Sequence, residues 1–200
     1  MKQYFILLAA VTFTINSFGQ LDKTNWLIGG NGTFNSFNHN YQSTVVNSES
    51  NVTEIKTTPN IGYFVVDKLA VGLKSSFSWR KEKEISAGAG KSNIIRFDYG
   101  PFIRYYFLDK EKPFNLLVDL TYQFGNLNFI PGDKGIRNNF SVVGGPVLYF
   151  NSSLGIEFLL GYRIEKEKLV STSSIPQNLF NDTKKGFQFS IGFQIHLEKL

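Results

Sequence analysis

One short segment carries residue types that contact phosphate in nucleotide-binding proteins. Residues 88–92, GAGKS, resemble the end of a P-loop, in which backbone N–H groups, a lysine and a serine hydroxyl hold the phosphates. The full motif requires a glycine at position 85, which is Ile85 here. The segment also falls between two predicted strands, without the helix whose N-terminus would hold a phosphate. We therefore expect no nucleotide binding.

Residues for nucleophilic catalysis and metal binding are scarce. The chain has no cysteine, which excludes zinc–thiolate sites and cysteine nucleophiles. Its two histidines are His39, in a predicted outer loop near Ser36 and Ser43, and His196, at the end of the last predicted strand. Nothing fixes a serine, a histidine and an acid in one place. We predict no enzyme activity, no cofactor and no metal site.

The most informative charged residues lie at alternate positions of predicted strands, on the face opposite the apolar side chains. On that face of a closed barrel they would line a pore or form an ion-paired plug. We favour the plug, because an eight-stranded barrel has little interior space and buried charges need partners. The candidate lumen charge network is Lys74, Arg96, Asp98, Arg104, Asp119, Glu157 and Arg163.

The strands that position these charges are visible as an alternation of apolar and polar residues with a period of two. In residues 114–125 all six side chains of one row are apolar, against one of six in the other. The other clear strands are 69–80, 95–107, 154–165 and 186–197, and weaker ones are 25–37, 53–66 and 139–150. Eight strands are predicted.

The predicted connections alternate between long and short. The long ones are 39–51, 81–93, 126–138 and 166–185, and the short ones are 67–68, 108–113 and 151–153. Outer-membrane barrels have even strand numbers, short periplasmic turns and long outer loops. This pattern places both termini on the periplasmic side. Pro59, Pro101 and Pro146 fall within strands, where proline cannot donate a ladder hydrogen bond, and predict local bulges.

The number of large apolar side chains decides which way the apolar face points. The five clear strands carry 29 of them on that face. A closed parallel barrel of eight strands holds only about 12 side chains in its core. The apolar rows also contain no charged residue, as expected where a midplane Arg or Lys would cost about 2–4 kcal/mol. We predict an all-β fold, an eight-stranded antiparallel up-and-down transmembrane β-barrel, and keep a secreted soluble barrel as the alternative.

Composition agrees with a folded, exported chain. Of 200 residues, 42% are hydrophobic and 18% charged, which excludes wholesale disorder. The 21 basic and 16 acidic residues form no basic stripe, so we expect no nucleic-acid partner. Lys2, the apolar run 5–13, and small residues at Ser17 and Gly19 predict a signal peptide over residues 1–19. Residues 20–200 then form the barrel domain.

Three segments resemble a known family. NWLIGG (25–30), PNIGYFVVD (59–67) and GPFIRYYF (100–107) are similar to the small outer-membrane β-barrel domain family related to OmpA, OmpX and OmpW. The last strand, with Ser190, Gly192, Ile195 and Leu197, resembles the family's terminal assembly signal, although the chain continues to Leu200. The resemblance covers residues 20–197. It implies localisation to the cell outer membrane, contact with outer-membrane lipid, and recognition by the barrel assembly machinery.

The architecture hosts several unrelated functions, so it does not select one. The leading hypothesis is an integral outer-membrane β-barrel protein with a structural or surface-interaction role through its long outer loops. The surface partner is unknown. The alternative is a narrow porin or a channel for small hydrophobic solutes, which the resemblance to OmpW-like proteins implies.

Overall fold

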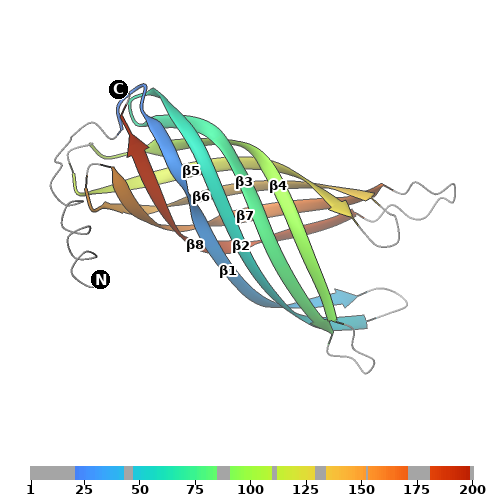
Figure 1. Cartoon of the computed structure of the whole chain (residues 1–200). Coiled ribbons are helices and arrows are strands. Elements are labelled where there is room, and N and C mark those ends of the chain that lie inside the picture. Colours follow the sequence, from blue (N-terminus) through green and yellow to red (C-terminus); the bar gives the residue numbers. More distant parts are fainter. Residues whose placement is uncertain are drawn as a thin grey trace, which may run out of the picture.

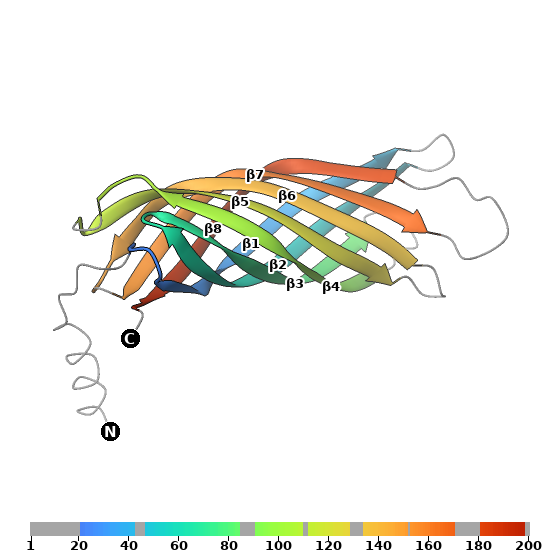
Figure 2. The same cartoon turned by 90° about the horizontal axis from the view of Figure 1, so that it is seen from above.

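The chain forms a closed barrel of eight antiparallel strands (Figures 1 and 2). The computed structural model describes residues 21–42, 47–84, 91–109, 112–128, 134–151, 153–170 and 181–198. Each strand pairs with its neighbours in the sequence, and the last closes onto the first. None of the described residues forms a helix long and apolar enough to cross a bilayer. The strands are β1 (Trp26–Gln42), β2 (Asn47–Val66), β3 (Leu69–Glu84), β4 (Lys91–Tyr106), β5 (Phe114–Asn128), β6 (Lys134–Tyr149), β7 (Leu154–Val170) and β8 (Asn181–Leu197).

The prediction of an all-β, eight-stranded antiparallel barrel is confirmed, but the strands are longer than predicted. β1 continues to Gln42, so His39 lies in a strand and its predicted position in a loop was wrong. β3 and β7 likewise extend beyond the predicted ranges. The reason is that the outward row changes from apolar to polar while strand pairing continues, as at Trp79 and Lys81. The apolar pattern therefore marks the edge of an apolar belt and not the end of the strand.

The short connections lie at the end of the barrel where β1 begins and β8 ends (Figure 1). Lys68 adopts a positive φ of 67° in the connection between β2 and β3. Its Nζ donates a 2.7 Å hydrogen bond to Asp109 Oδ1 in the connection between β4 and β5. That hydrogen bond from the ammonium holds the pKa of the Asp109 carboxyl below its usual range. The pair thus ties two turns together at the rim.

The three strand prolines do not produce the predicted bulges. At each of Pro59, Pro101 and Pro146, the ladder with one of the two neighbouring strands lacks residue pairs. The register of that ladder is nevertheless the same before and after the gap. The recorded register shift lies elsewhere, between Phe64 and Val66. Proline removes a donor without adding a residue to the strand, so a lost ladder bond is sufficient to accommodate it.

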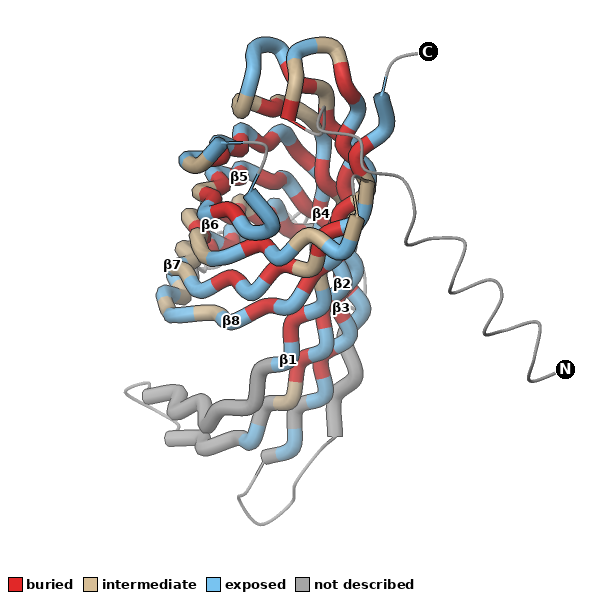
Figure 3. The backbone as a smooth tube through the Cα atoms, turned by 90° about the vertical axis from the view of Figure 1, so that its left-hand side faces the viewer, coloured by how far each residue is buried: buried red, intermediate tan, exposed pale blue. Residues whose placement is uncertain are grey.

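The outer surface carries an apolar belt, and the polar row faces the interior. Figure 3 shows buried and exposed positions alternating along the strands. Aromatic side chains gather toward both ends of the belt, with Trp26 and Tyr63 5.3 Å apart at one end and Phe77 and Phe97 4.9 Å apart at the other. Such a belt with two aromatic girdles is typical of barrels that lie in lipid. The exposed aromatics include Trp26, Phe34, Phe77, Trp79, Phe97, Tyr105, Phe107, Phe114, Phe124, Phe140 and Phe150.

Away from the termini the barrel divides into two sheets. The β1–β8 ladder runs from the pair Trp26–Leu197 to the pair Thr33–Ser190, although both strands continue further. The β4–β5 ladder likewise ends at the pair Asp98–Gly125. Among the described residues, β1–β4 and β5–β8 therefore continue as two separate four-stranded sheets. Figures 1 and 3 show the two sets of strands diverging toward that end.

Position on the outward row should decide whether a charge is tolerated. Leu120 lies mid-strand on the outer face of β5, and Asn126 lies on the same row beyond the belt. We expect Leu120→Arg to lower the free energy of unfolding in lipid vesicles by about 2–4 kcal/mol and Asn126→Arg to lower it by about 0–1 kcal/mol. Urea titration monitored by the mobility of unheated samples in electrophoresis measures both. Equal effects of the two variants would show that the belt is misplaced.

Candidate functional site in the barrel lumen

An apolar cluster fills the lumen at the end where β1 begins and β8 ends. Leu21, Leu27, Phe64 and Tyr106 are fully buried there. Leu21, which precedes β1, is held by its carbonyl oxygen, which accepts a 2.8 Å bond from the backbone N–H of Lys68. The His196 ring lies 5.7–5.9 Å from the rings of Phe64, Tyr106 and Tyr149. His196 is therefore part of this seal, and it lies far along the chain from His39, the other histidine.

A group of four charged residues forms the next layer of the lumen, which we term the inner cluster. Arg104 donates from Nε to Asp119 Oδ2 at 2.9 Å and from Nη1 to Glu157 Oε1 at 2.7 Å. Lys74 Nζ donates to Asp119 Oδ1 at 2.5 Å. None of the four side chains is more than 4% exposed. Two cations face two carboxylates, so the inner cluster is electrically balanced, as buried charges require.

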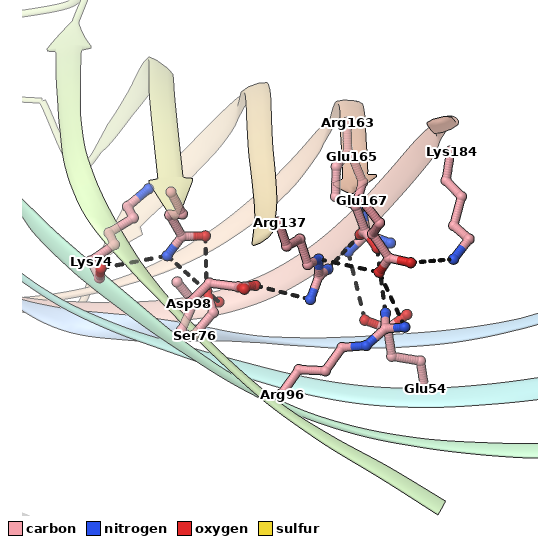
Figure 4. Close-up of polar contacts among 12 residues, drawn as sticks. Glu54, Lys74, Ser76, Arg96, Asp98, Arg137, Arg163, Glu165, Glu167 and Lys184 are labelled. Carbon is pink, nitrogen blue, oxygen red and sulfur yellow. Dashed lines mark hydrogen bonds and ion pairs between the residues drawn. The ribbon is translucent and has the colours of Figure 1, made fainter. Parts of the chain in front are cut away.

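The outer cluster lies further from the termini and crosses between the two sheets (Figure 4). Arg137 of β6 contacts Asp98 of β4 at 3.1 Å and Glu165 of β7 at 2.5 Å. Arg96 of β4 contacts Glu165 at 3.3 Å and Glu167 at 3.2 Å. Because β4 belongs to one sheet and β6 and β7 to the other, these ion pairs join sheets that no longer share a ladder. Further pairs are Arg163 with Glu54 at 3.7 Å and with Glu165 at 3.9 Å, Arg137 with Glu167 at 3.8 Å, and Lys184 with Glu167 at 3.1 Å.

The structure places all seven charged residues of the candidate network on the inner face and divides them between the clusters. Lys74, Arg104, Asp119 and Glu157 form the inner cluster, whereas Arg96, Asp98 and Arg163 belong to the outer one.

Five further charged residues, which were not among the predicted network, complete the outer cluster: Glu54, Arg137, Glu165, Glu167 and Lys184. A period-two signal for them was present, since Glu165 and Glu167 continue the inward row of Arg163. Glu54 and Glu165 lie inside the predicted strands 53–66 and 154–165 but were not assigned to the network, whereas Arg137, Glu167 and Lys184 lie in the predicted loops 126–138 and 166–185.

Several predicted features fall outside the described residues. They include the signal peptide at 1–19, most of the GAGKS segment, and Ser43 beside His39. Within the described part of the chain, no group of three or more histidine, cysteine, aspartate or glutamate side chains is arranged to hold a metal ion.

The fold is similar to that of a solved outer-membrane protein. The outer membrane protein OprG from Pseudomonas aeruginosa aligns over 92% of this chain and 100% of its own, with 12% identity and a TM-score of 0.57. The N-terminal β-barrel domain of P. aeruginosa OprF aligns over 88% and 98%, with 11% identity and a TM-score of 0.42. Neisserial surface protein A aligns over 86% and 94%, with 13% identity and a TM-score of 0.38. No protein-family model and no curated protein sequence matches the chain. The likeness to OprG shows a common fold.

The stability of the barrel should depend more on the charge balance of the inner cluster than on the volume of its side chains. Asp119→Ala removes the carboxylate that contacts Lys74 and one of the two carboxylates that contact Arg104. Breaking a buried ion pair in this way should lower the free energy of unfolding by about 3–5 kcal/mol. Lys74→Met combined with Asp119→Ala removes the uncompensated ammonium and should recover part of that loss. Urea unfolding in lipid vesicles measures both free energies.

Asp109→Ala, at the exposed rim, is the control and should change stability little. An Asp119→Ala protein as stable as the Asp109→Ala protein would contradict the assignment of a buried, balanced cluster.

Proposed function

We propose that this protein is an integral outer-membrane barrel with a closed lumen, whose role is structural or depends on contacts at the end opposite its termini. The observation that carries the proposal is the combination of an apolar outer belt with an interior closed by an apolar seal and two ion-pair clusters. The barrel therefore offers its outer end, and not its interior, for interaction.

Strand length supports a membrane position with projecting ends. A strand of 16 residues such as β3 spans roughly 37 Å at about 3.3 Å per residue and about 45° of tilt. The apolar band of such barrels is only about 25 Å tall. Exposed lysines follow the belt directly on the outward rows, at Lys81, Lys166 and Lys185. Lysines at that level contact headgroups and water, so the strands beyond them stand outside the membrane.

Export and assembly belong to the same proposal. A signal peptide over residues 1–19 would direct the chain across the inner membrane. The last strand, β8, pairs with both β1 and β7 and completes the barrel. A strand in that position is suited to recognition by the assembly machinery, and outer-membrane lipid then covers the belt.

A second candidate function is passage of small hydrophobic solutes, favoured by the wall between β1 and β8. An apolar groove of about 450 Å³ lies on the outer face there, over Gly30, Gly32, Pro59, Ile191 and Phe193. It adjoins the point where the β1–β8 ladder ends. A short cross-linker between Phe34→Cys and Phe189→Cys, the next positions in register, should block uptake of an apolar dye if solutes pass here. Unchanged uptake would exclude the route.

The closed lumen makes a direct prediction for planar bilayers. We expect the folded protein to show no steady unit current, because the seal around Tyr106 and the inner cluster both cross the lumen. Protein from the same preparation must show distinct mobilities before and after boiling, which establishes that it is folded. Steady unit currents whose size changes in Arg104→Gln or Glu157→Gln would overturn the closed lumen and favour a narrow porin.

A further inference from the structure

A small polar cavity lies in the lumen and has an unusual lining. Its volume is about 20 Å³, and its walls include Lys56 of β2 and Lys74 of β3. Apart from Val143, every other lining side chain carries a hydroxyl or an amide, and no carboxylate lines it. Since Lys74 belongs to the inner cluster and Lys56 lies two residues from Glu54 of the outer cluster, the cavity separates the two clusters. It is a polar space bounded by two cations.

Lys56 has no direct counter-ion in the described structure. Its side chain is 6% exposed, yet no hydrogen bond or ion pair joins it to another described residue. Glu54 and Asp98, the acidic groups in its surroundings, contact Arg163 and Arg137 respectively. Both guanidinium groups also repel the Lys56 ammonium. A lysine side chain that is only 6% exposed and has no ion pair with a described residue gains from an anionic or strongly polar group in the adjoining cavity.

Lys74 has hydrogen-bonding capacity left on the same cavity. Its ammonium has three N–H donors. One is used by Asp119 Oδ1 at 2.5 Å and one by Thr121 Oγ1 at 3.0 Å. No hydrogen bond to another described side chain uses the third donor; Lys74 lines the cavity, and its Nζ also lies 4.8 Å from the centre of the Phe102 ring.

The described part of the lumen contains more basic than acidic side chains. Among the described inward-facing side chains, eight basic residues face six acidic ones, a difference of two. The basic residues are Lys56, Lys74, Arg80, Arg96, Arg104, Arg137, Arg163 and Lys184, and the acidic ones are Glu54, Asp98, Asp119, Glu157, Glu165 and Glu167.

We propose that this cavity binds one small inorganic anion of the size of chloride, held between Lys56 and Lys74. A polar space of about 20 Å³ is enough for one small ion such as a halide. Hydroxyl groups of Thr33, Thr58 and Ser190 on β1, β2 and β8 line the same space. The anion would link both sheets of the divided barrel, because the lining comes from strands of each.

Bromide is the probe that tests the site. Crystals of the folded protein grown in sodium bromide should show one anomalous peak in the cavity, whose occupancy rises with bromide concentration and saturates. In solution, bromide should raise the unfolding midpoint with an effect that saturates as its concentration rises. Absence of a peak in the cavity, or an effect on the midpoint that never saturates, would overturn the proposal.

A matched pair of variants separates the site from general electrostatics. Lys56→Met keeps the length of the side chain and removes its charge, and should weaken bromide binding by about tenfold or more, which corresponds to about 1.4 kcal/mol. Lys184→Met removes a lumen cation that does not line the cavity, and should leave the affinity within about twofold. Equal weakening by both variants would show that the halide responds only to the net charge of the lumen. The crystal measurement on the unaltered protein stays informative if Lys56→Met fails to fold.

Discussion

In the apolar part of a bilayer every backbone N–H and C=O must find a partner within the protein, and a sheet meets that requirement only by closing on itself. Eight strands closed in this way leave an interior barely wider than the side chains that fill it. The two faces of each strand then follow from opposite demands. The outward row must be apolar along the belt, and the inward row must fill a narrow space with groups that satisfy one another.

Charged side chains in that narrow space must be paired, and their arrangement differs along the barrel. Where the ladder is complete, the inner cluster joins β3, β4, β5 and β7 across the lumen through Arg104 and Asp119. Beyond the pairs Thr33–Ser190 and Asp98–Gly125, where the ladders end, the ion pairs of the outer cluster join the two sheets. Arginine suits this position because its planar group donates to several carboxylates at once, as Arg137 does. Ion pairs here substitute for backbone hydrogen bonds.

The sequence was sufficient for strand number, topology and the direction of each face, because burial in a barrel repeats with a strict period of two. It was insufficient beyond the apolar belt, where the outward row is polar as well as the inward row. Beyond Trp79 and Ile164 the outward residues are lysines, so the alternation in polarity disappears although the alternation in burial continues through Glu165 and Glu167. Partners across the lumen, such as Arg137 with Asp98, were also beyond reach, because they depend on the stagger between strands that are not neighbours.

The glycines of the inward rows follow from the small diameter and not from any need for flexibility. A Cβ at Gly72 would overlap the backbone of β2 and the ring of Phe102, and one at Gly62 would meet the same ring. Glycine on β2 and β3 therefore makes room for a large side chain on β4. With Phe102 in place, Lys74 lies 4.8 Å from its ring centre and is directed toward Asp119. The space left by absent side chains thus determines where the buried lysine and its counter-ion meet, and the ion pairing of the lumen depends on glycine packing as much as on charge.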